Sequence, residues 1–286
     1  MPKNTDLSAE LTRIAEALER LSPPPPKKPD FKKARAALWY GSSKGFETIK
    51  HVNAVPLDYL VGIDSQKQQL LENTEAFQKG FTANNTLLWG ARGMGKSSLI
   101  KAVHQHQNKQ NEDNPLILIE ILREEIDTID QCLAHLKERP ERFILFCDDL
   151  SFEPQDKAYK ALKAVLEGGI IGRPDNVLFY ATSNQRHLLP RRHSEYENRD
   201  YLNDTDITNE TVSLSDRFGL WLGFHNCSNE DYKQMVINYA VHYKIPLVRK
   251  ELLDEAHKWQ MARGARSGRV AWQYIQHLLG KYEIQL

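Results

Sequence analysis

Apolar residues in the middle of the chain form short, nearly continuous runs that alternate with amphipathic stretches. The runs lie at 85–89, 116–122, 143–147, 177–182 and 220–224. Each is five to seven residues long with little polar alternation, which predicts strands buried on both faces. Residues 98–103, 124–138 and 158–166 have helical spacing, as does the second half of 57–77. Strands that alternate with helices predict an α/β fold on a parallel sheet with right-handed crossovers.

Both ends of the chain have helical periodicity without strands. An N-terminal apolar stripe, with spacings of four, three, four and three, predicts an amphipathic helix over residues 1–22. The stripe consists of Leu7, Leu11, Ile14, Leu18 and Leu21. This helix either packs on its own chain or binds a partner helix. Residues 228–286 contain three helical segments, beginning near residues 229, 249 and 267, and predict a small helical domain.

The segment between the first helix and the strands has two interpretations. Prolines at 23–26 end the helix and predict a stiff spacer. Residues 27–54 mix basic and aromatic side chains. They either bind single-stranded nucleic acid or form a linker whose aromatic rings dock on the domain while the lysines stay in solvent. The predicted organisation is a helix at 1–22, a linker at 23–54, an α/β core at 55–227 and a helical lid at 228–286.

Composition narrows the class of protein. The 286 residues include 38 Lys and Arg and 38 Asp and Glu, so the formal net charge is zero. Bulk charge therefore gives no reason to expect nonspecific binding to nucleic acid, although a local basic patch stays open. Cys132, Cys147 and Cys227 are scattered without metal-ligand spacing, which favours a reducing compartment. The sequence has neither a membrane-spanning apolar run nor a signal-peptide pattern, so we expect a cytoplasmic protein without a membrane partner.

A glycine-rich loop lies between the first of these strands and its helix. Its sequence, Gly-Ala-Arg-Gly-Met-Gly-Lys-Ser at 90–97, has the spacing of a phosphate-binding P-loop. The glycines let successive backbone N–H groups point inward, and the positive end of the following helix faces the same place. Lys96 is expected to reach the β- and γ-phosphates, and the Ser97 hydroxyl to hold Mg²⁺. The predicted nucleotide-binding residues here are Gly90, Ala91, Arg92, Gly93, Met94, Gly95, Lys96, Ser97 and Ser98.

Two adjacent acids follow the strand at 143–147. Asp148 and Asp149 come at its carboxyl end, where open α/β sheets bind ligands. We assign Asp148 to Mg²⁺, together with Ser97, and Asp149 to the general base that activates water. Glu153 is near enough in sequence to compete for the base role. The alternative is that these acids only end a strand in a solvated turn.

Three later polar positions are weaker candidates. Asn184 ends the strand at 177–182 and is expected to contact the γ-phosphate or the water, although Asn after a strand often only makes a turn. Arg217 precedes the last strand and is expected either to act on a neighbouring subunit's nucleotide or to pair with a nearby acid. Arg266 and Arg269 flank the start of the final helix. One of them is expected to reach the phosphates; the alternative is a basic helix start that binds no ligand.

The order of these motifs resembles that of AAA+ ATPases. The P-loop, Asp148-Asp149, Asn184, Arg217 and the Arg266/Arg269 region are similar to Walker A, Walker B, sensor 1, arginine finger and sensor 2. The segment with Val61 and Gly62 is similar to the one that contacts adenine. More narrowly, the stretches 87–90, 147–153, 181–190 and 214–221 resemble a bacterial family of predicted AAA+ ATPases, domain of unknown function 815.

This resemblance implies a P-loop NTPase fold of AAA+ type, with sheet order 5-1-4-3-2 and a C-terminal helical lid. It also implies ATP and Mg²⁺ as ligands and a homo-oligomer in which Arg217 acts in trans. Two departures stand out. Most AAA+ proteins have Glu where this chain has Asp149, and Arg269-Val270-Ala271 fits the sensor 2 pattern better than Arg266 does.

The sequence therefore supports two functional hypotheses. The first is a Mg²⁺-dependent ATPase that couples turnover in an oligomer to remodelling of a protein or nucleoprotein partner. The partner would bind through the N-terminal helix or residues 27–54, and whether it contains nucleic acid stays open. The second is a nucleotide-gated binding module with negligible turnover, which the shorter carboxylate of Asp149 favours.

Overall fold

The predicted parallel sheet forms the centre of the protein. The computed structural model describes residues 5–21, 29–31, 34–152, 156–167, 173–186, 188 and 214–285. Five parallel strands lie in the order β4-β5-β6-β3-β7. They are β3 (Thr86–Gly90), β4 (Leu116–Ile121), β5 (Arg142–Cys147), β6 (Val177–Ser183) and β7 (Leu220–Phe224). Read from β7 and numbered from the P-loop strand β3, this is the order 5-1-4-3-2, which confirms the prediction.

Two further strands extend the sheet beyond β4. β1 (Ala36–Trp39) pairs in parallel with β4, and β2 (Phe46–Ile49) pairs antiparallel with β1 at the edge. The short helix α2 (Gly41–Lys44) connects them. The prediction of a linker over 23–54 is therefore wrong for this stretch. Four-residue strands with exposed charges between them do not produce the long apolar runs from which the other strands were predicted.

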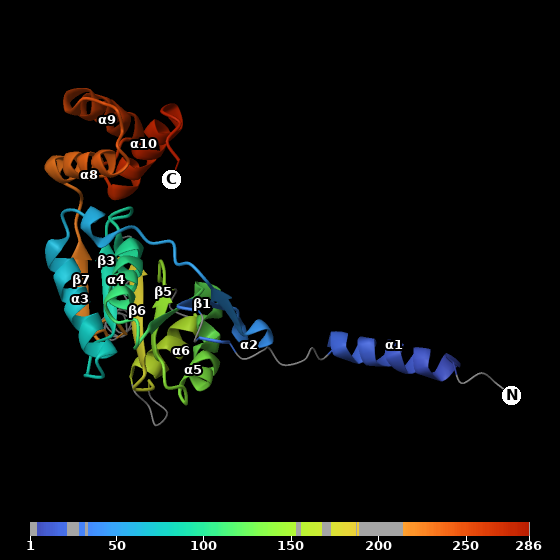
Figure 1. Ribbon diagram of the computed structural model, residues 1–286. Coiled ribbons are helices and arrows are strands. Elements are labelled where there is room, and N and C mark those ends of the chain that lie inside the picture. The colour runs from blue at the N-terminus through green and yellow to red at the C-terminus, as the bar shows by residue number, and fades with distance from the viewer. Residues whose placement is uncertain are drawn as a thin grey trace, which may run out of the picture.

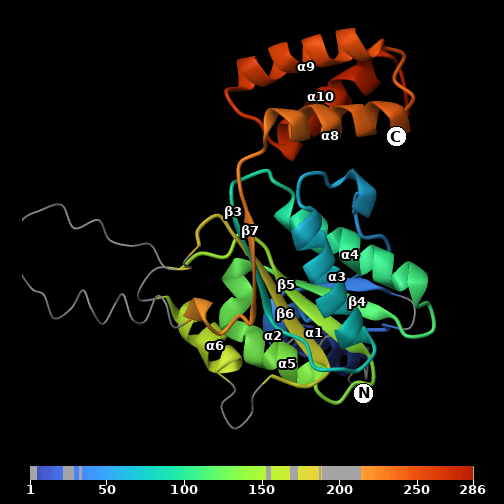
Figure 2. The same ribbon diagram turned by 90° about the vertical axis from the view of Figure 1, so that its left-hand side faces the viewer.

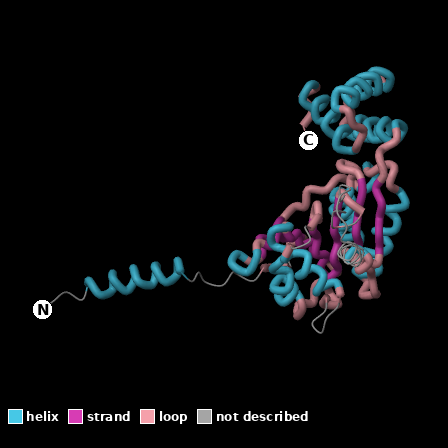
Figure 3. The backbone as a smooth tube through the Cα atoms, turned by 180° about the vertical axis from the view of Figure 1, so that it is seen from behind, coloured by secondary structure: helices cyan, strands magenta, loops and turns pink. Residues whose placement is uncertain are grey.

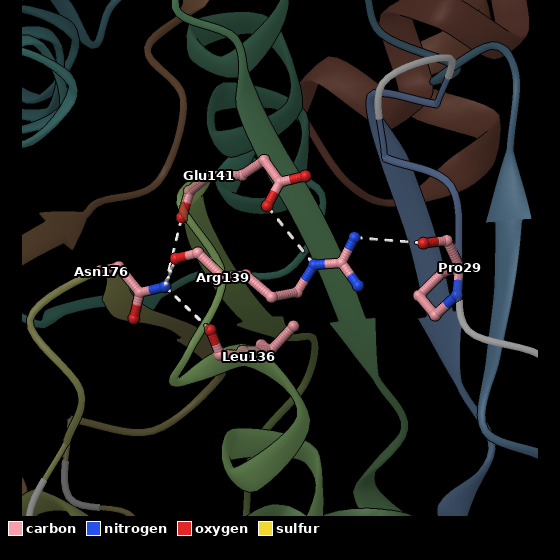
Figure 4. A network of polar contacts seen from close by, with 5 residues as sticks. All are labelled: Pro29, Leu136, Arg139, Glu141 and Asn176. Atoms are coloured by element: carbon pink, nitrogen blue, oxygen red, sulfur yellow. Dashed lines mark hydrogen bonds and ion pairs between the residues drawn. The ribbon is translucent and has the colours of Figure 1, made fainter.

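The chain just before β1 is anchored on the α/β core. The ring of Phe31 is fully buried, and the Arg139 guanidinium lies 4.7 Å above its centroid. Arg139 also donates a hydrogen bond from Nη2 to the carbonyl oxygen of Pro29 (3.2 Å) and one from Nε to Glu141 (3.4 Å), as Figure 4 shows. The aromatic ring thus docks on the domain, and a buried ring is not available to stack on a nucleobase.

Asn176 closes the turn from which Arg139 reaches this segment. Its side-chain amide donates to the carbonyl oxygens of Leu136 and Arg139 at 2.9 Å and of Glu141 at 3.2 Å (Figure 4). The Leu136 carbonyl oxygen, at the end of α5 (Ile129–Leu136), also accepts from the Arg139 N–H (3.1 Å), and the other two carbonyls lie beyond the helix, where no intrahelical partner exists. The Asn176 side chain therefore fixes the connection that enters β5, at the amino ends of the parallel strands.

Helices cover both faces of the sheet (Figures 1 and 2). α3 (Asp64–Gln78) and α4 (Lys96–Gln110) pack on one face. The 3-10 helix η2 (Arg123–Thr128), α5 (Ile129–Leu136) and α6 (Lys157–Leu166) pack on the other. The helix predicted at 124–138 is thus divided into a 3-10 turn and an α-helix. Two apolar layers, one on each face, explain why the strands are apolar throughout.

Three helices form the predicted lid, α8 (Asn229–His242), α9 (Arg249–Arg263) and α10 (Gly268–Lys281). Figure 2 shows them gathered beyond one end of the sheet, reached directly from β7. Ser228 and Ser267 cap α8 and α10 by accepting hydrogen bonds from backbone N–H groups. Buried residues of α8 and α10 belong to the same apolar cluster as those of α4. The 3-10 helix η1 (Leu57–Tyr59) packs against this cluster. The lid therefore rests on the core.

The N-terminal helix α1 (Thr5–Leu21) lies apart from the rest of the described chain in Figures 1 and 3. Among the described residues, no helix combines the length and the apolar character that crossing a bilayer requires.

Candidate nucleotide-binding site

A cavity of about 560 Å³ lies between the carboxyl ends of the central strands and the lid. Polar residues from the P-loop, β5 and β6 line one part of it, and apolar residues from η1, α8 and α10 line another. The lining residues are Val55, Tyr59, Leu60, Val61, Ile63, Arg92, Gly93, Met94, Gly95, Lys96, Ser97, Ser98, Asp148, Asp149, Thr182, Asn184, Met235, Tyr239, Gly268, Arg269 and Trp272. The cavity is within the size range of small-molecule sites.

The P-loop backbone requires its glycines. Gly90, Gly93 and Gly95 have φ angles of 125°, 74° and 88°, which residues with a Cβ rarely adopt. At Gly90 a Cβ would also lie 2.1 Å from the carbonyl oxygen of Phe224 on β7. Gly95 is the N-cap of α4, so the helix begins at the loop and directs its positive end into the cavity.

Lys96 is buried at the base of this loop and is held by three acceptors. Its Nζ donates to the carbonyl oxygens of Gly90 (2.8 Å) and Ala91 (2.9 Å) and to Oδ1 of Asn184 (3.2 Å). Burial lowers the pKa of Lys96 below its ordinary value, and the nearby Asp149 partly opposes this shift. A phosphate would therefore meet an ammonium group that is already oriented but poorly solvated.

Ser97 and Asp148 are brought together as predicted for a metal site. The Ser97 hydroxyl donates to Oδ1 of Asp148, and so does the hydroxyl of Thr182 from the neighbouring strand. Thr182 thereby fixes the direction of the carboxylate. A hydroxyl oxygen and one carboxylate, open to a cavity, suit Mg²⁺, which keeps several waters and is usually bound through one or two carboxylates and substrate phosphates.

Asp149 has an unusual backbone conformation. Its φ of 51° is left-handed, which Asp tolerates better than most residues. The conformation is held by its own N–H, which donates to the Thr182 hydroxyl (2.9 Å), and by the N–H of Leu150, which donates to the Thr182 carbonyl oxygen (2.7 Å). Asn184 donates from Nδ2 to the Asp149 carboxylate. Asn184 therefore bridges Lys96 and Asp149 across the cavity.

Aromatic side chains form the apolar end of the cavity. Tyr59 from η1 lies 5.6 Å from Tyr239 of α8, measured between ring centroids, and Tyr239 lies 5.2 Å from Trp272 of α10. Val55 and Val61 line the same cavity. Flat apolar walls of this kind accommodate a nucleobase, because aromatic rings stack favourably on other π systems.

The lid contacts the P-loop directly. The backbone N–H of Arg269, at the start of α10, donates to the carbonyl oxygen of Gly93 (3.2 Å). A Cβ at Gly93 would lie 3.0 Å from the Ser267 hydroxyl oxygen and 3.2 Å from the Arg269 Cβ. Of the two predicted arginines, Arg269 lines the cavity, whereas Arg266 is outside the residues that line it. The geometry therefore favours Arg269 as the lid arginine.

Some predicted site residues lie elsewhere. Gly62, at φ 77°, packs against Asp231 at the start of α8 and is not a lining residue. Arg217 forms an ion pair with Glu167 (3.4 Å). It precedes Leu220, which pairs with the first residue of β3, so it lies at the opposite end of the sheet from the P-loop. Glu153 lies outside the described residues.

Several lining residues were not predictable from the sequence. Thr182 stands within a predicted strand and showed no sign of its two contacts with the acids. Tyr59, Tyr239 and Trp272 come from segments far apart in the chain, and helical periodicity alone does not distinguish a ring that lines a cavity from one in the core. The contact between Arg269 and Gly93 was likewise not predictable from either local sequence.

The chain is similar in structure to two solved proteins. The Aeropyrum pernix ORC1 protein, solved in complex with DNA, matches 80% of this chain and 65% of its own at 11% identity, with a TM-score of 0.53. The Thermotoga maritima RuvB Holliday junction branch migration motor matches 77% of this chain and 71% of its own at 13% identity, with a TM-score of 0.45. At such low identity, the ORC1 match supports the fold alone.

No curated protein matches the chain. Residues 32–282 match the family described as protein of unknown function (DUF815). This range includes every strand, the whole cavity and the lid. Because this match spans most of the chain, the chain belongs to the DUF815 family.

Proposed function

We propose that the protein is a Mg²⁺-dependent ATPase. The observation that carries the proposal is the convergence of Lys96, the Ser97–Asp148 pair and the Asp149–Asn184 pair on one cavity beneath the lid. Lys96 and the backbone of the loop bind the β- and γ-phosphates. Bound between Ser97 and Asp148, Mg²⁺ would neutralise charge that develops on these phosphates. The adenine base lies among Tyr59, Val61, Tyr239 and Trp272.

Hydrolysis needs only one proton transfer by the protein. Water between Asp149 and the γ-phosphate gives a proton to the Asp149 carboxylate while its oxygen bonds to the γ-phosphorus. The bond from phosphorus to the β,γ-bridging oxygen breaks, ADP retains that electron pair, and inorganic phosphate is released. Asn184 orients the carboxylate and, through Lys96, aligns it with the transferred group.

The contact between the lid and the P-loop would couple hydrolysis to the position of the lid. The backbone N–H of Arg269 in the lid is hydrogen-bonded to the Gly93 carbonyl oxygen in the P-loop. Entry or loss of the γ-phosphate would therefore act on the loop and the lid together and shift the position of the lid. In a homo-oligomer, Arg217 of one protomer completes the site of the next. The resulting movement remodels a protein or nucleoprotein partner.

The proposal is tested by calorimetric titration with ATP and Mg²⁺ and by phosphate release. Lys96→Ala should abolish binding, because the buried ammonium is the principal contact to the phosphates. Asp149→Asn should retain binding and lower turnover by about 10²- to 10⁴-fold; Asn also tolerates a left-handed φ, so the loop should fold normally. Lys109→Ala, at the exposed far end of α4, is the matched control. Wild-type hydrolysis by Lys96→Ala would refute the site.

A second candidate is a nucleotide-gated binding module with negligible turnover. It is favoured by one observation: the short Asp149 carboxylate is already hydrogen-bonded to Asn184 and therefore less free to accept a proton. Phosphate release measured against protein concentration separates the two functions. A rate per protomer that rises steeply with concentration supports the ATPase, whereas tight binding with a flat rate near zero supports the module.

A further inference from the structure

The apolar face of α1 is uncovered. Its four described apolar side chains are all more than half exposed: Leu7 61%, Leu11 57%, Ile14 55% and Leu18 59%. Figures 1 and 3 show the helix apart from the α/β core. A helix of 17 residues is marginal in water without tertiary contacts. Its stability therefore requires a surface that covers this face.

The spacing on this face is that of a coiled coil. Steps of four, three, four and three residues from Leu7 to Leu21 give a period of 3.5, with Leu11 and Leu18 at heptad position a and Leu7, Ile14 and Leu21 at position d. A helix that packs on a globular surface usually has a wider apolar stripe with a period of 3.6. The narrow seam of α1 fits another helix with the same spacing.

The described part of the α/β core and lid offers no matching surface. Its exposed large apolar side chains do not form a row along any one element. Phe81 follows α3, Leu122 follows β4, Val241 ends α8, and Val248 and Met261 lie at opposite ends of α9. No described segment therefore presents an apolar groove as long as the α1 seam.

The positions that flank the seam allow identical helices to approach. Positions e and g are Ser8, Glu10, Ala15 and Ala17, so only one of the four carries a charge and like-charge repulsion is small. The two alanines permit close packing. Both a positions are Leu, and the d positions are Leu, Ile and Leu, so the seam is apolar along its whole length.

We propose that α1 is an oligomerisation element, in which the seam packs against the α1 helix of a further copy of this chain to form a coiled coil. The interaction is independent of the nucleotide. It would also raise the effective concentration of neighbouring cores.

Disulfide cross-linking of the full-length chain tests this directly. The native cysteines Cys132, Cys147 and Cys227 are buried, so a thiol introduced into α1 reports contact between copies. Ile14 lies next to the helix midpoint, so its counterpart is directly opposite in a parallel alignment and within one helical turn in an antiparallel one. Under mild oxidation Ile14→Cys should form covalent dimers, and Glu16→Cys, on the opposite side of the helix, should form at least about tenfold less.

Two second-site variants distinguish the seam from random collision. Leu11→Glu in the Ile14→Cys background should abolish the cross-link, whereas Ala9→Glu, away from the seam, should leave it unchanged. Equal cross-linking at positions 14 and 16, or none at position 14, would overturn the proposal and leave a foreign helix as the occupant.

Light scattering on the nucleotide-free wild type measures the number of strands. We expect a mass of at least twice the 33.0 kDa of one chain. A mass of one chain would overturn self-association through α1. Because no nucleotide is present, failure of the ATPase proposal would not change these results.

Discussion

Thr182 contacts both Asp148 and Asp149 and holds them in different arrangements. Its hydroxyl donates to the Asp148 carboxylate and accepts from the Asp149 N–H, so one side chain holds the metal ligand and the left-handed backbone of the base. Loss of this buried hydroxyl should affect more than its two hydrogen bonds, because residues that orient metal ligands influence metal affinity and the rate of catalysis.

Thr182→Val should separate this positioning role from folding. Val matches Thr in shape but removes the hydroxyl, so we expect Mg²⁺ affinity in the presence of ATP, or turnover, to fall by about 10- to 100-fold. Titration of the phosphate-release rate with Mg²⁺ measures the effect. Thr86→Val, equally buried but at the other end of the sheet, should show an unchanged Mg²⁺ dependence; a Thr182→Val profile identical to it would contradict the assignment.

Lys96 gives nucleotide binding a pH dependence with a definite sign. Burial lowers its pKa from 10.5, so in the free protein the ammonium loses its proton at a lower pH than an ordinary lysine. The phosphates bind the protonated form. Affinity should therefore fall as pH rises through the lowered pKa, by up to about tenfold per pH unit, and binding should take up a proton in that range.

Calorimetry in two buffers with different ionisation enthalpies measures this proton uptake. The control is Lys96→Arg, because a guanidinium stays charged throughout. The variant should bind ATP more weakly and lose the proton uptake on the alkaline side. Equal uptake by wild type and variant would show that another group titrates.

At the level of elements, β1 depends on one side chain. Trp39 is fully buried; its indole N–H donates to the Thr128 hydroxyl (2.8 Å), and its ring lies 4.7 Å from that of Phe46 on β2. Trp39→Ala should lower the free energy of unfolding by about 3–5 kcal/mol through the cavity it leaves. Denaturant titration measures this loss, and Glu47→Ala, on the exposed part of β2, should change stability by less than about 0.5 kcal/mol. A Trp39→Ala midpoint equal to the wild-type value would mean that the edge strands do not contribute.

The contrast between β1 and the central strands shows what the sequence could predict. β4, β5 and β6 are covered on both faces, so nearly every residue is apolar and the runs are conspicuous. β1 has four residues and β2 exposes its two middle ones, and such short runs resemble a linker that contains a few aromatic rings. Their place in the sheet depends on pairing with β4, which no local pattern encodes.

The same distinction applies to the site. Loop chemistry is local, so the P-loop residues and the Ser97–Asp148 pair were predictable from motif and strand order. The aromatic end of the cavity depends on where the lid lies, and Tyr59 and Trp272 are brought together only by packing of α8 and α10 on the core. Sequence periodicity identifies the lid helices but not which of their faces meets the nucleotide.

At the scale of the whole molecule, Arg217 lies too far from the cavity of its own protomer to contact a nucleotide bound there. It lies beyond the start of β7, a full strand length, roughly 16 Å, from the end of the sheet that carries the cavity. Its ion pair with Glu167 joins two side chains that are 46% and 35% exposed, and such surface pairs contribute little. The guanidinium can therefore be released to a neighbour at small cost.

Mixing two inactive variants tests this arrangement. Lys96→Ala lacks a functional site but keeps Arg217, and Arg217→Ala keeps the site but lacks the arginine, so each alone should hydrolyse ATP at a small fraction of the wild-type rate. When they are mixed in equal amounts before ATP is added, about one quarter of the interfaces combine an intact site with an intact arginine, and activity should recover towards that fraction. The control mixture pairs Lys96→Ala with the double variant Lys96→Ala/Arg217→Ala and should stay inactive, because no protomer in it has a working site. Arg217→Ala with wild-type activity on its own, or a test mixture no more active than the control, would mean that each protomer completes its own site and that assembly serves a purpose other than hydrolysis.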